Sequence, residues 1–376
     1  MPEQFDLIVV GSGGMGSSAF YHAAMSGRRV LALDRFPAAH DRGSSHGESR
    51  IIRQAYFEHP NYVPLLLDAY QLWDQLEKNT QRQLFIHSGL LEVGFPDGPI
   101  IRGILESSEQ YGVAVEQVSE NQFRKQFPMF DKLDSQVVVV EPQAGYLLVE
   151  KCVQAHIDAA VELGGTIRSG VTVVDIVPEK KQVEIVTETE SYTASQVIVT
   201  AGAWSAELLS WIGVDLRVLR KHLYWFDATT HQSDLSNGVP SYFYETDTGY
   251  YYGFPAIDGR IKVARHSGGD NVDDPLNVDR SSDSDDLGQV QKFLRQYLRY
   301  EAAQPNRHAI CMYTMTANEH FIVDRHPDCD QIVFAAGMSG HGFKFSPVIG
   351  RQLVRLLDGE SDARFEFLSV AAHQTN

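Results

Sequence analysis

Apolar runs and glycine-rich turns near the N-terminus predict a strand–helix–strand unit. The run FDLIVV at 5–10 is apolar and rich in β-branched residues, which is typical of a parallel strand buried on both faces. A tight turn is predicted at 11–16, and the small residues at 17–26 are compatible with a helix. RRVLALD at 28–34 is a second predicted strand. Together these segments predict one βαβ unit.

The same pattern of a strand followed by glycine returns much later in the chain. ASQVIVTAGAW at 194–204 is a predicted strand that stops at Gly202, and DQIVFAAGMSGHGF at 330–343 is another that ends in glycines. The segment at 148–165 has helical spacing and ends at paired glycines, so we expect it to cross back to the first domain. One nucleotide-binding sheet is therefore expected to combine segments that are far apart in the sequence.

The stretches between these segments are strand-like and aromatic, and they predict a second domain with a mixed or antiparallel sheet. They lie at 84–95, 135–142, 220–228, 248–255 and 260–266. A chain of 376 residues is also longer than one core usually supports, so two domains are expected. The predicted fold class is α/β with an α+β second domain: a Rossmann-like domain formed by 1–83, 145–218 and 321–376, and a substrate domain formed by 84–144 and 219–320.

The turn GSGGMG at 11–16 fits the pattern G-x-G-x-x-G of dinucleotide-binding sites. It follows a predicted strand and opens a helix, and Asp34 lies 18 residues after its last glycine. In this pattern Gly11 permits the tight turn, Gly13 lets the backbone approach a pyrophosphate, and Gly16 lets the helix pack on the strand. The helix N-terminus then favours the pyrophosphate charge, and Asp34 is expected to accept hydrogen bonds from ribose hydroxyls.

This fingerprint alone does not separate FAD from NAD. A nicotinamide dehydrogenase would normally complete one contiguous nucleotide-binding domain, whereas the sheet predicted here is completed only near residue 340. That arrangement favours FAD, whose isoalloxazine ring must reach into a second domain. The other predicted cofactor contacts in this part of the chain are Gly14, Met15, Arg35 and Gly202.

The amino-acid composition mainly argues against certain classes of binding partner. The formal net charge of −17 disfavours nucleic acid and anionic membranes. No apolar run reaches the roughly 20 residues that span a bilayer. The N-terminal MPEQFDLIVV has no basic segment before a long apolar run, so we expect a cytoplasmic protein. Because Cys152, Cys311 and Cys329 form no CxxC pair, no metal or redox dithiol is predicted.

Five longer motifs resemble the family of monomeric sarcosine oxidase and N-methyltryptophan oxidase. They are GSSHGESRIIRQAY (43–56), GYYYGFP (249–255), IKVARHSGG (261–269), CMYTMTANEHFIVDRHP (311–327) and AAGMSGHGFKFSPVIG (335–350). The resemblance runs over essentially the whole chain and implies FAD attached covalently through a cysteine. It also implies an enzyme, commonly a monomer, that oxidises a small N-methyl amine with O2. The implied products are the demethylated amino acid, formaldehyde and hydrogen peroxide.

The resemblance assigns the chemistry to residues far from the fingerprint. Cys311 matches the flavin-linked cysteine, and Lys262 matches a lysine near flavin N5 that promotes the reaction with O2. A preorganised cation at that place would stabilise the developing superoxide charge. On a strand Lys262 would point away from its neighbours Ile261 and Val263, as a solvated surface lysine also would. The pattern alone therefore favours a surface lysine, and the resemblance reverses this.

Arg53 and Lys344 match the pair that binds the substrate carboxylate, for which two converging cations are suited. His46 and Arg50 match residues that line the flavin. His46, Arg50 and Arg53 would share one face of a helix, but RIIRQAY could equally be a strand in which their directions differ. The sequence leaves this choice open.

Further pocket residues are implied by the same resemblance. Tyr252, His266 and Tyr313 match residues that face the amine and the flavin, although each taken singly is more often a core residue. The last glycine-rich motif matches a segment that passes the flavin carbonyl edge, and its predicted cofactor contacts are Gly340, His341, Gly342 and Lys344.

The identity of the amine is less defined than the reaction. CMYTMT is more similar to the sarcosine branch, and KVARHSGG to the N-methyltryptophan branch. We expect sarcosine or another small N-methyl amino acid, with N-methyltryptophan, proline or pipecolate as alternatives. Other readings are an FAD dehydrogenase that passes electrons to a carrier, an NAD(P)-dependent dehydrogenase, and a non-catalytic nucleotide-binding protein, against which the basic and aromatic residues argue.

Overall fold

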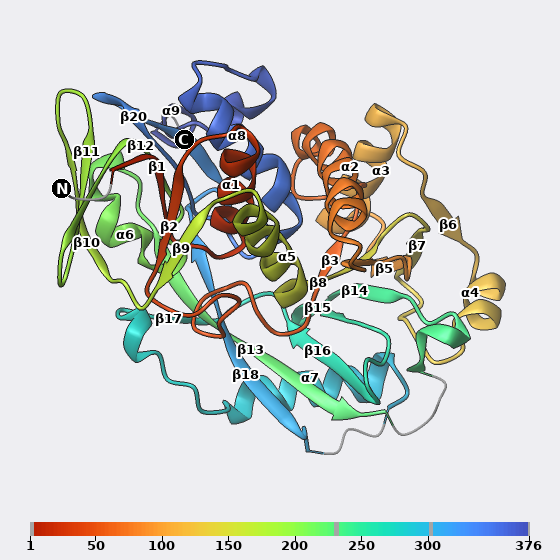
Figure 1. The fold of residues 1–376 in the computed structure, drawn as a ribbon. Helices are drawn as coiled ribbons and strands as arrows, with labels where there is room; N and C mark the ends of the chain where they lie inside the picture. Colours follow the sequence, from red (N-terminus) through yellow and green to blue (C-terminus); the bar gives the residue numbers. More distant parts are fainter. Residues whose placement is uncertain (1–3, 229–232, 301–303, 375–376) are drawn as a thin grey trace.

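The structure is a computed structural model that describes residues 4–228, 233–300 and 304–374. Two large sheets organise this part of the chain (Figure 1). The first contains, in spatial order, β10 (Val173–Pro178), β11 (Val183–Thr187), β12 (Ser191–Val199), β1 (Gln4–Val10), β2 (Val30–Asp34) and β9 (Thr166–Ser169), with β20 (Cys329–Ala336) paired to β12 and β19 (Ile322–His326) paired to β20.

Strand β1 lies between β12 and β2, and both neighbours run parallel to it. Its side chains alternate between two cores: Leu7 and Val9 belong to the core under the helices, and Ile8 and Val10 to the core on the opposite face. Burial on both faces explains why this strand is a continuous apolar run. The helical face is covered by α1 (Gly14–Met25), α5 (Val149–Glu162) and α8 (Ser346–Leu357), which Figure 1 shows beside one another.

The first sheet combines distant segments, as the sequence predicts. β12 pairs in parallel with β1, and β20 pairs in parallel with β12, so segments almost 330 residues apart lie in one sheet. Backbone bonds continue this pairing past the strand ends, where the Thr200 N–H donates to the Val10 carbonyl at 2.9 Å. The carboxyl ends of β1 and β12 therefore meet at the turn that carries the glycine fingerprint.

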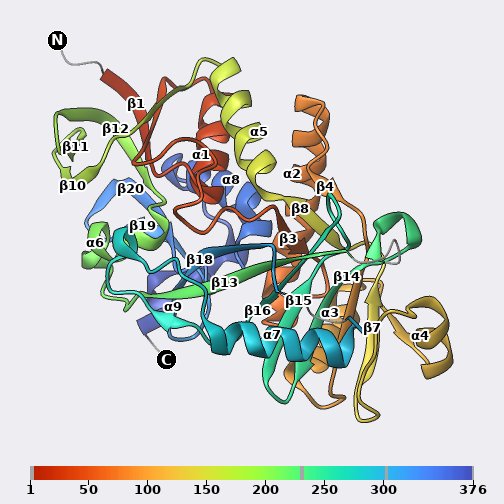
Figure 2. The same cartoon turned by 90° about the horizontal axis from the view of Figure 1, so that it is seen from below.

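The second sheet is mostly antiparallel and lies over helix α7 (Ser284–Tyr297). Figure 2 shows α7 crossing its strands. In spatial order the strands are β17 (Asp270–Asn271), β13 (Arg217–Asp227), β16 (Arg260–Arg265), β15 (Gly249–Gly253), β14 (Ser241–Thr246), β5 (Leu90–Gly94), β7 (Val137–Glu141) and β6 (Glu116–Val118), with β18 (Arg307–Met315) paired to β13.

Side chains of the second sheet alternate between α7 and the first domain. Tyr251 stacks on Phe293 of α7 with ring centroids 4.6 Å apart, and Ile261 and Val263 pack in the same core. Lys262 lies between these two residues in sequence and therefore points to the other face of the sheet. That face is also buried, so Lys262 is only 1% exposed and is not the surface lysine that the pattern alone suggests.

Smaller elements connect the two sheets. A three-stranded sheet consists of β3 (Ser49–Ile52), β8 (Gly145–Leu148) and β4 (Phe85–Ile86). Within RIIRQAY, Arg50 to Ile52 form a strand, whereas Arg53 to Tyr56 lie outside any helix or strand. The other helices are α2 (Val63–Thr80), α3 (Pro99–Tyr111), α4 (Glu120–Gln126), α6 (Ser205–Leu208) and α9 (Val370–Gln374), with short 3-10 turns that include η2 (Gly202–Trp204) and η7 (Phe343–Phe345).

The predicted α/β fold class with a second, mixed-sheet unit is confirmed, whereas the residue boundaries of the two domains stay a prediction. Two local predictions differ from the structure. Helix α1 begins at Gly14, inside the predicted turn. The strand predicted at 84–95 is divided into β4 and β5, because Gly89 between them has φ +67°. Among the described residues, no helix is both long and apolar enough to cross a membrane.

The contact between α1 and β1 makes a prediction about stability. A Cβ on Gly16 would lie 1.7 Å from the Gly11 carbonyl oxygen, so Gly16→Ala should force the helix off the strand and lower the free energy of unfolding by about 3 kcal/mol or more. Gly288→Ala in α7 is the control, because nothing lies within 4 Å of its added Cβ, and it should raise stability by up to ~1 kcal/mol. Urea denaturation measures both, and equal stability of the two variants would contradict this account.

Candidate active site

The turn after β1 leaves room for a ligand at one glycine only. Gly11 has φ +88°, and a Cβ there would lie 2.5 Å from the carbonyl oxygen of Thr200. The space beside Gly16 is filled by the Gly11 carbonyl. A Cβ on Gly13 would meet only the Ser45 hydroxyl, at 3.6 Å. Gly11 and Gly16 are thus required for packing, while Gly13 keeps the space in front of the α1 N-terminus open.

Asp34 is held against this turn at the end of β2. Its Oδ2 accepts hydrogen bonds from the Ser12 N–H at 2.6 Å and from the Ser12 hydroxyl at 2.8 Å, and its Oδ1 accepts one from the Phe36 N–H at 2.9 Å. A carboxylate has about four acceptor positions, so Asp34 keeps capacity for a ribose hydroxyl. Ser12 was not predicted from the sequence, where the predicted contacts of the turn are its glycines and Met15.

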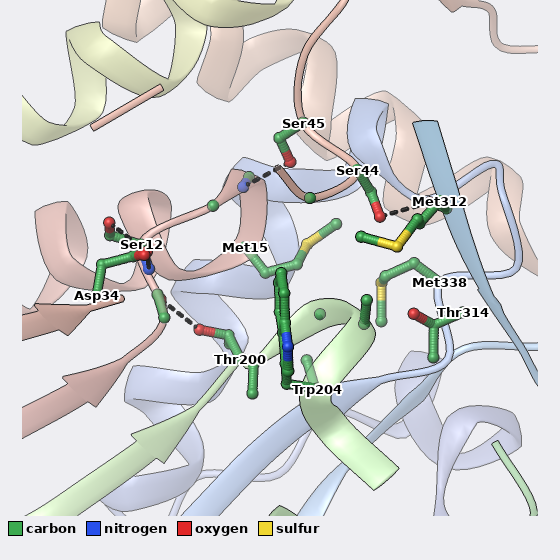
Figure 3. Close-up of a pocket in the computed structure, with 18 of the residues that line it drawn as sticks. Ser12, Met15, Asp34, Ser44, Ser45, Thr200, Trp204, Met312, Thr314 and Met338 are labelled. Atoms are coloured by element: carbon green, nitrogen blue, oxygen red, sulfur yellow. Dashed lines mark hydrogen bonds between the residues drawn. The ribbon is translucent and has the colours of Figure 1, made fainter. Parts of the chain in front are cut away.

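A cavity of about 1340 Å³, part of it open to solvent, extends from this turn to strand β18. Because its lining residues extend from Ser12 and Asp34 to Thr314, the cavity suits an elongated ligand. Figure 3 shows Ser12 and Asp34 at one side of the cavity, and Met312, Thr314 and Met338 at the other. The cavity thus joins the fingerprint of the first sheet to the second sheet.

Three polar atoms in the cavity wall need a partner. The Arg35 Nη1, the Trp204 Nε1 and the Thr314 Oγ1 are buried and have no hydrogen-bond partner among the described residues. Buried polar atoms are nearly always hydrogen-bonded in folded proteins, so these atoms fit a polar ligand that lies along the cavity. The Arg35 guanidinium also lies 5.4 Å from the centre of the Trp204 ring, which orients it at the fingerprint end.

A second cavity adjoins the first, with four lining residues in common: Arg50, Tyr313, Gly340 and Phe343. It encloses about 470 Å³, again including space open to solvent. Its remaining walls combine cations, an acid, a histidine pair and aromatic rings: Ile51, Arg53, Glu58, Phe243, Tyr252, His266, His341 and Lys344. A molecule in the second cavity would therefore contact the end of a ligand in the first.

The predicted cation pair, Arg53 and Lys344, meets in this second cavity. Lys344 is 5% exposed, and its Nζ donates to the His341 carbonyl at 2.7 Å and to the Tyr56 hydroxyl at 3.4 Å. Arg53 is 3% exposed, and its Nη2 donates to Glu58 Oε2 at 2.5 Å. Glu58 was not predicted from the sequence, where one glutamate in FEHPNY carries no distinguishing pattern. A substrate carboxylate must compete with it for Arg53.

Burial and neighbouring charges shift the pKa values in this cavity. Burial, and then the charge of Arg53, lower the pKa of Lys344 to about 7. Burial alone would raise the pKa of Glu58, but Arg53 outweighs it and lowers that pKa to about 2. Burial lowers the pKa of His266 to about 3 and that of His341 to about 4. Near neutral pH both histidines are uncharged, and Lys344 is close to its midpoint.

Lys262 lies behind the first cavity, enclosed by backbone oxygens. Its Nζ donates to the carbonyls of Gly47 at 2.6 Å and Ser49 at 2.8 Å, and lies 3.4 Å from the Ser49 hydroxyl. Burial, and then Arg50, lower the pKa of Lys262 well below its usual range. Three oxygen acceptors match the three N–H donors of an ammonium group. These hydrogen bonds partly offset the loss of hydration that disfavours the charged form of Lys262.

Cys311 and Arg50 meet on the inner face of β18. The Arg50 Nη2 lies 3.2 Å from the Cys311 Sγ and donates to the Ser44 carbonyl at 2.9 Å. Cys311 is 1% exposed, and the next residue, Met312, lines the first cavity. The three cysteines are free thiols, and Cys152 on α5 is buried too.

The other predicted aromatic and histidine residues divide between the two sides. Tyr252, His266 and Tyr313 line the second cavity, and the Tyr313 hydroxyl lies 3.4 Å from His266 Nδ1. His46 lies apart from both cavities and is 3% exposed, and burial followed by the charge of Arg50 lowers its pKa to about 4. It is therefore an uncharged neighbour of the arginine that does reach both cavities.

The predicted residues are distributed over the site as follows. Those that line the first cavity are Gly11, Gly13, Gly14, Met15, Asp34, Arg35, Gly202, Gly340 and Gly342. Those that line the second are Arg53, Tyr252, His266, His341 and Lys344, while Arg50, Tyr313 and Gly340 line both. Gly16, His46, Lys262 and Cys311 are buried and line neither. The roles of all these site residues stay predictions.

The chain matches a known family over most of its length. The family described as FAD dependent oxidoreductase, abbreviated DAO, matches residues 6–356. The protein belongs to this family. This FAD-dependent oxidoreductase is 36% identical over 361 residues to monomeric sarcosine oxidase of Bacillus sp. (strain NS-129), covering 95% of this chain and 93% of the relative. It is 37% identical over 348 residues to N-methyl-L-tryptophan oxidase of Yersinia pestis (strain Pestoides F), covering 92% and 93%. The family resemblance seen in the sequence is thereby confirmed.

Solved structures share the fold of this FAD-dependent oxidoreductase. Glycine oxidase from Geobacillus kaustophilus superposes with a TM-score of 0.83 at 17% identity and covers 98% of each chain. L-proline dehydrogenase from P. horikoshii superposes with a TM-score of 0.85 at 17% identity and covers 100% of this chain and 99% of its own. One is named an oxidase and the other a dehydrogenase, so the fold by itself does not select the electron acceptor.

The first cavity fits the FAD that this family binds. Gly13 and the α1 N-terminus face the space where a pyrophosphate is stabilised by N–H groups and the helix dipole. Asp34 would accept hydrogen bonds from a ribose, and Arg35, Trp204 and Thr314 offer buried polar atoms along the wall. These residues would hold the cofactor with its ring end toward the second cavity.

The low pKa of Lys344 predicts a pH dependence of stability. The unfolded lysine keeps its proton up to about pH 10.5, whereas the folded one loses it near pH 7, so the unfolded state binds more protons between these values. The free energy of unfolding of the wild type should therefore rise with pH in this window. The advantage of Lys344→Met over the wild type should be largest near pH 7 and shrink toward pH 10.5.

Urea denaturation of the FAD-loaded proteins across this pH range provides the measurement. Lys292→Met, on the exposed side of α7, removes a lysine charge from water and serves as the control. A stability difference for Lys344→Met that does not change with pH would contradict a lowered pKa for Lys344.

Proposed function

We propose that this protein is an oxidase that demethylates a small N-methyl amino acid of the sarcosine type. The amine, O2 and water would give the amino acid, formaldehyde and hydrogen peroxide. The observation that carries the proposal is the second cavity, where Arg53 and Lys344 converge beside residues shared with the cofactor cavity. The 36% identity to a relative named monomeric sarcosine oxidase supports the substrate class and action as a monomer.

Arg53 and Lys344 would anchor the substrate carboxylate. An arginine binds a carboxylate through two parallel N–H bonds, and a second cation nearby adds to the affinity. A bound carboxylate would also raise the pKa of Lys344 and favour its charged form. With the carboxylate fixed at this end, the amine and its methyl group point to the wall shared by the two cavities. Such positioning contributes much of the rate of an enzymatic reaction.

The walls of the cavity favour the neutral amine. Only an amine with a free electron pair is oxidised, and burial among Phe243, Tyr252 and Tyr313 disfavours an ammonium ion. The charge of Arg50 acts in the same direction. FAD, when bound, supplies the two-electron acceptor and the reaction with O2. The protein would hold the substrate, keep its amine neutral and exclude water.

Lys262 would supply the positive charge for the reaction with O2. Electron transfer to O2 creates negative charge, which a fixed ammonium stabilises without reorganisation. The carbonyls of Gly47 and Ser49 hold the Lys262 Nζ in one place. The same lysine is absent from the substrate cavity, so its role is separable from substrate binding.

The proposal predicts which amines are turned over and what the acceptor is. With purified protein in air, sarcosine should give hydrogen peroxide and formaldehyde faster than N-methyltryptophan, proline or pipecolate. Lys262→Met should slow the step with O2 on the order of 10²-fold, while reduction of the bound FAD by sarcosine without air changes little. Stopped-flow absorbance separates these two steps.

Different outcomes of this experiment select different enzymes. Faster turnover of N-methyltryptophan would favour the second candidate, which the 37% identity to a relative of that name supports. Reduction by the amine without peroxide in air would identify a dehydrogenase that uses an electron carrier. If Lys262→Met left the reaction with O2 unchanged, the role proposed for Lys262 would be wrong.

We also propose that FAD is joined to Cys311 by a thioether. Cys311 on β18 contacts Arg50 and precedes Met312, and both of these residues line the cofactor cavity. Acid denaturation should leave the yellow colour in the protein pellet, and Cys311→Ser should release it to the supernatant. Cys329→Ser, at a half-buried thiol on β20, is the matched control and should keep the colour in the pellet. Colour in the wild-type supernatant would exclude the link.

A further inference from the structure

Glu92 is a buried acid that the proposed mechanism does not use. It lies in the middle of β5, its side chain is fully buried, and it does not line either cavity. Neither of its carboxyl oxygens has a hydrogen-bond partner among the described residues. Burying a carboxyl group without a hydrogen-bond partner is energetically costly. Such a group in the middle of a sheet calls for a partner nearby.

The group opposite Glu92 is the Arg53 guanidinium, which also lacks one of its hydrogen-bond partners. The Arg53 Nε is buried without a hydrogen-bond partner and lies 3.8 Å from Glu92 Oε1. That separation is about 1 Å longer than a hydrogen bond. The other end of the guanidinium, Nη2, is bonded to Glu58 in the wall of the second cavity. Arg53 therefore has one end at the cavity and one end at Glu92.

The sheet register and the aromatic rings restrict where the guanidinium can move. Glu92 pairs with Phe243 of β14, whose ring lies 5.7 Å from the Arg53 guanidinium carbon. The rings of Phe57 and Tyr56 lie 4.2 and 4.8 Å from the same atom. A small shift along the remaining direction would bring Nε within hydrogen-bonding distance of Glu92.

A second acid anchors the backbone next to Arg53. Glu141, on the neighbouring strand β7, accepts hydrogen bonds from the N–H groups of Gln54 at 2.6 Å and Ala55 at 3.0 Å. The backbone after Arg53 is thus held by Glu141, while the Arg53 side chain faces Glu92. The two acids occupy the same face of the sheet, since the register places Val139 of β7 opposite Glu92 and Glu141 lies two residues further along that strand.

We propose that Glu92 is a positioning residue for substrate recognition: after a small shift of the guanidinium, it accepts the Nε–H of Arg53 from behind and holds the guanidinium with its Nη groups toward the substrate carboxylate. This inference rests on the proposed binding of that carboxylate by Arg53 and Lys344. When a substrate carboxylate replaces Glu58 as the partner of the Arg53 Nη2, the Arg53 guanidinium loses its hydrogen bond to Glu58. The contact between Nε and Glu92 then holds the guanidinium in place.

The charge state of Glu92 suits this role. The groups that face it are Arg53, Glu58, Glu141 and the Tyr70 hydroxyl. Burial raises the pKa of Glu92 well above its usual range, and Glu141 and Glu58 act in the same direction against Arg53. A protonated carboxyl still accepts a hydrogen bond through its carbonyl oxygen. It can orient Arg53 without neutralising the charge that the substrate carboxylate needs.

The test uses the FAD-loaded enzyme and a ligand pair that differs only in charge. Propionate carries a carboxylate but no oxidisable amine, and propionamide is its neutral analogue. Titration of each is followed by the change in flavin absorbance. Glu92→Leu should weaken propionate binding about 5- to 10-fold, which corresponds to the net value of one ordinary hydrogen bond. Glu92→Gln keeps a neutral acceptor and should bind propionate within about 2-fold of the wild type.

Turnover and stability separate positioning from a structural role. For the substrate amine, Glu92→Leu should raise KM with little change in kcat, and Glu92→Gln should restore KM. Removal of a buried acid that lacks partners should not lower the thermal midpoint of unfolding. Glu245→Leu is the control, because Glu245 is a buried acid of β14 that lies beside the N–H groups of Phe95 and Ile100 instead of Arg53.

The outcomes distinguish this inference from the proposed function. If propionate perturbs the wild-type spectrum no more than propionamide, the carboxylate site is wrong, and the role of Glu92 falls with it. If the wild type binds propionate and Glu92→Leu binds it equally well, only the inference about Glu92 fails. Equal weakening in Glu92→Gln and Glu92→Leu would also overturn it, because a neutral acceptor would then not suffice.

Discussion

The close contact between the start of α1 and the end of β1 is the constraint on which the site depends. The helix can begin directly after the strand only because Gly16 lies against the Gly11 carbonyl and Gly11 takes a positive φ. Thr200 at the end of β12 closes the same contact, since its hydroxyl donates to the Gly11 carbonyl at 2.8 Å. The positive end of the helix is thereby aimed into the first cavity. The cofactor site is a consequence of how closely the helix and two strands pack.

The second sheet completes the site because both of its faces are buried. One face packs on α7 through apolar and aromatic side chains, and the other turns toward the first domain. In such a sheet every second residue faces the site, so Lys262, Tyr252 and Phe243 are directed there by the alternation of the strands. Strand β18 contributes the consecutive residues Met312 and Tyr313 to the cavity walls. The two cavities lie where this face meets the ends of the strands of the first sheet.

Buried cations distinguish this region from the rest of the core. Burial of a charged side chain is costly unless it is paired or hydrogen-bonded. Lys262 and Lys344 meet this cost with backbone carbonyls, and Arg53 with Glu58. Lys221 follows the same rule, with three carbonyls within 2.8 Å of its Nζ. Shifted pKa values concentrated around one cavity are typical of a functional site, and here they favour an anionic substrate with an uncharged reacting amine.

The dinucleotide fingerprint, the two-part fold and the family resemblance could all be predicted from the amino-acid sequence. These features are local or extend over the whole chain: glycine spacing at 11–16, continuous apolar strands, and long motifs around Cys311 and Lys344. Only the tertiary structure decided the direction of Lys262, the strand conformation around Arg50, and the pairing of Arg53 with two acids. The physical reason is that burial and charge pairing depend on residues far apart in sequence. Period-two alternation specifies that a side chain changes face, but the packing of a second layer decides whether that face is solvent or the active site.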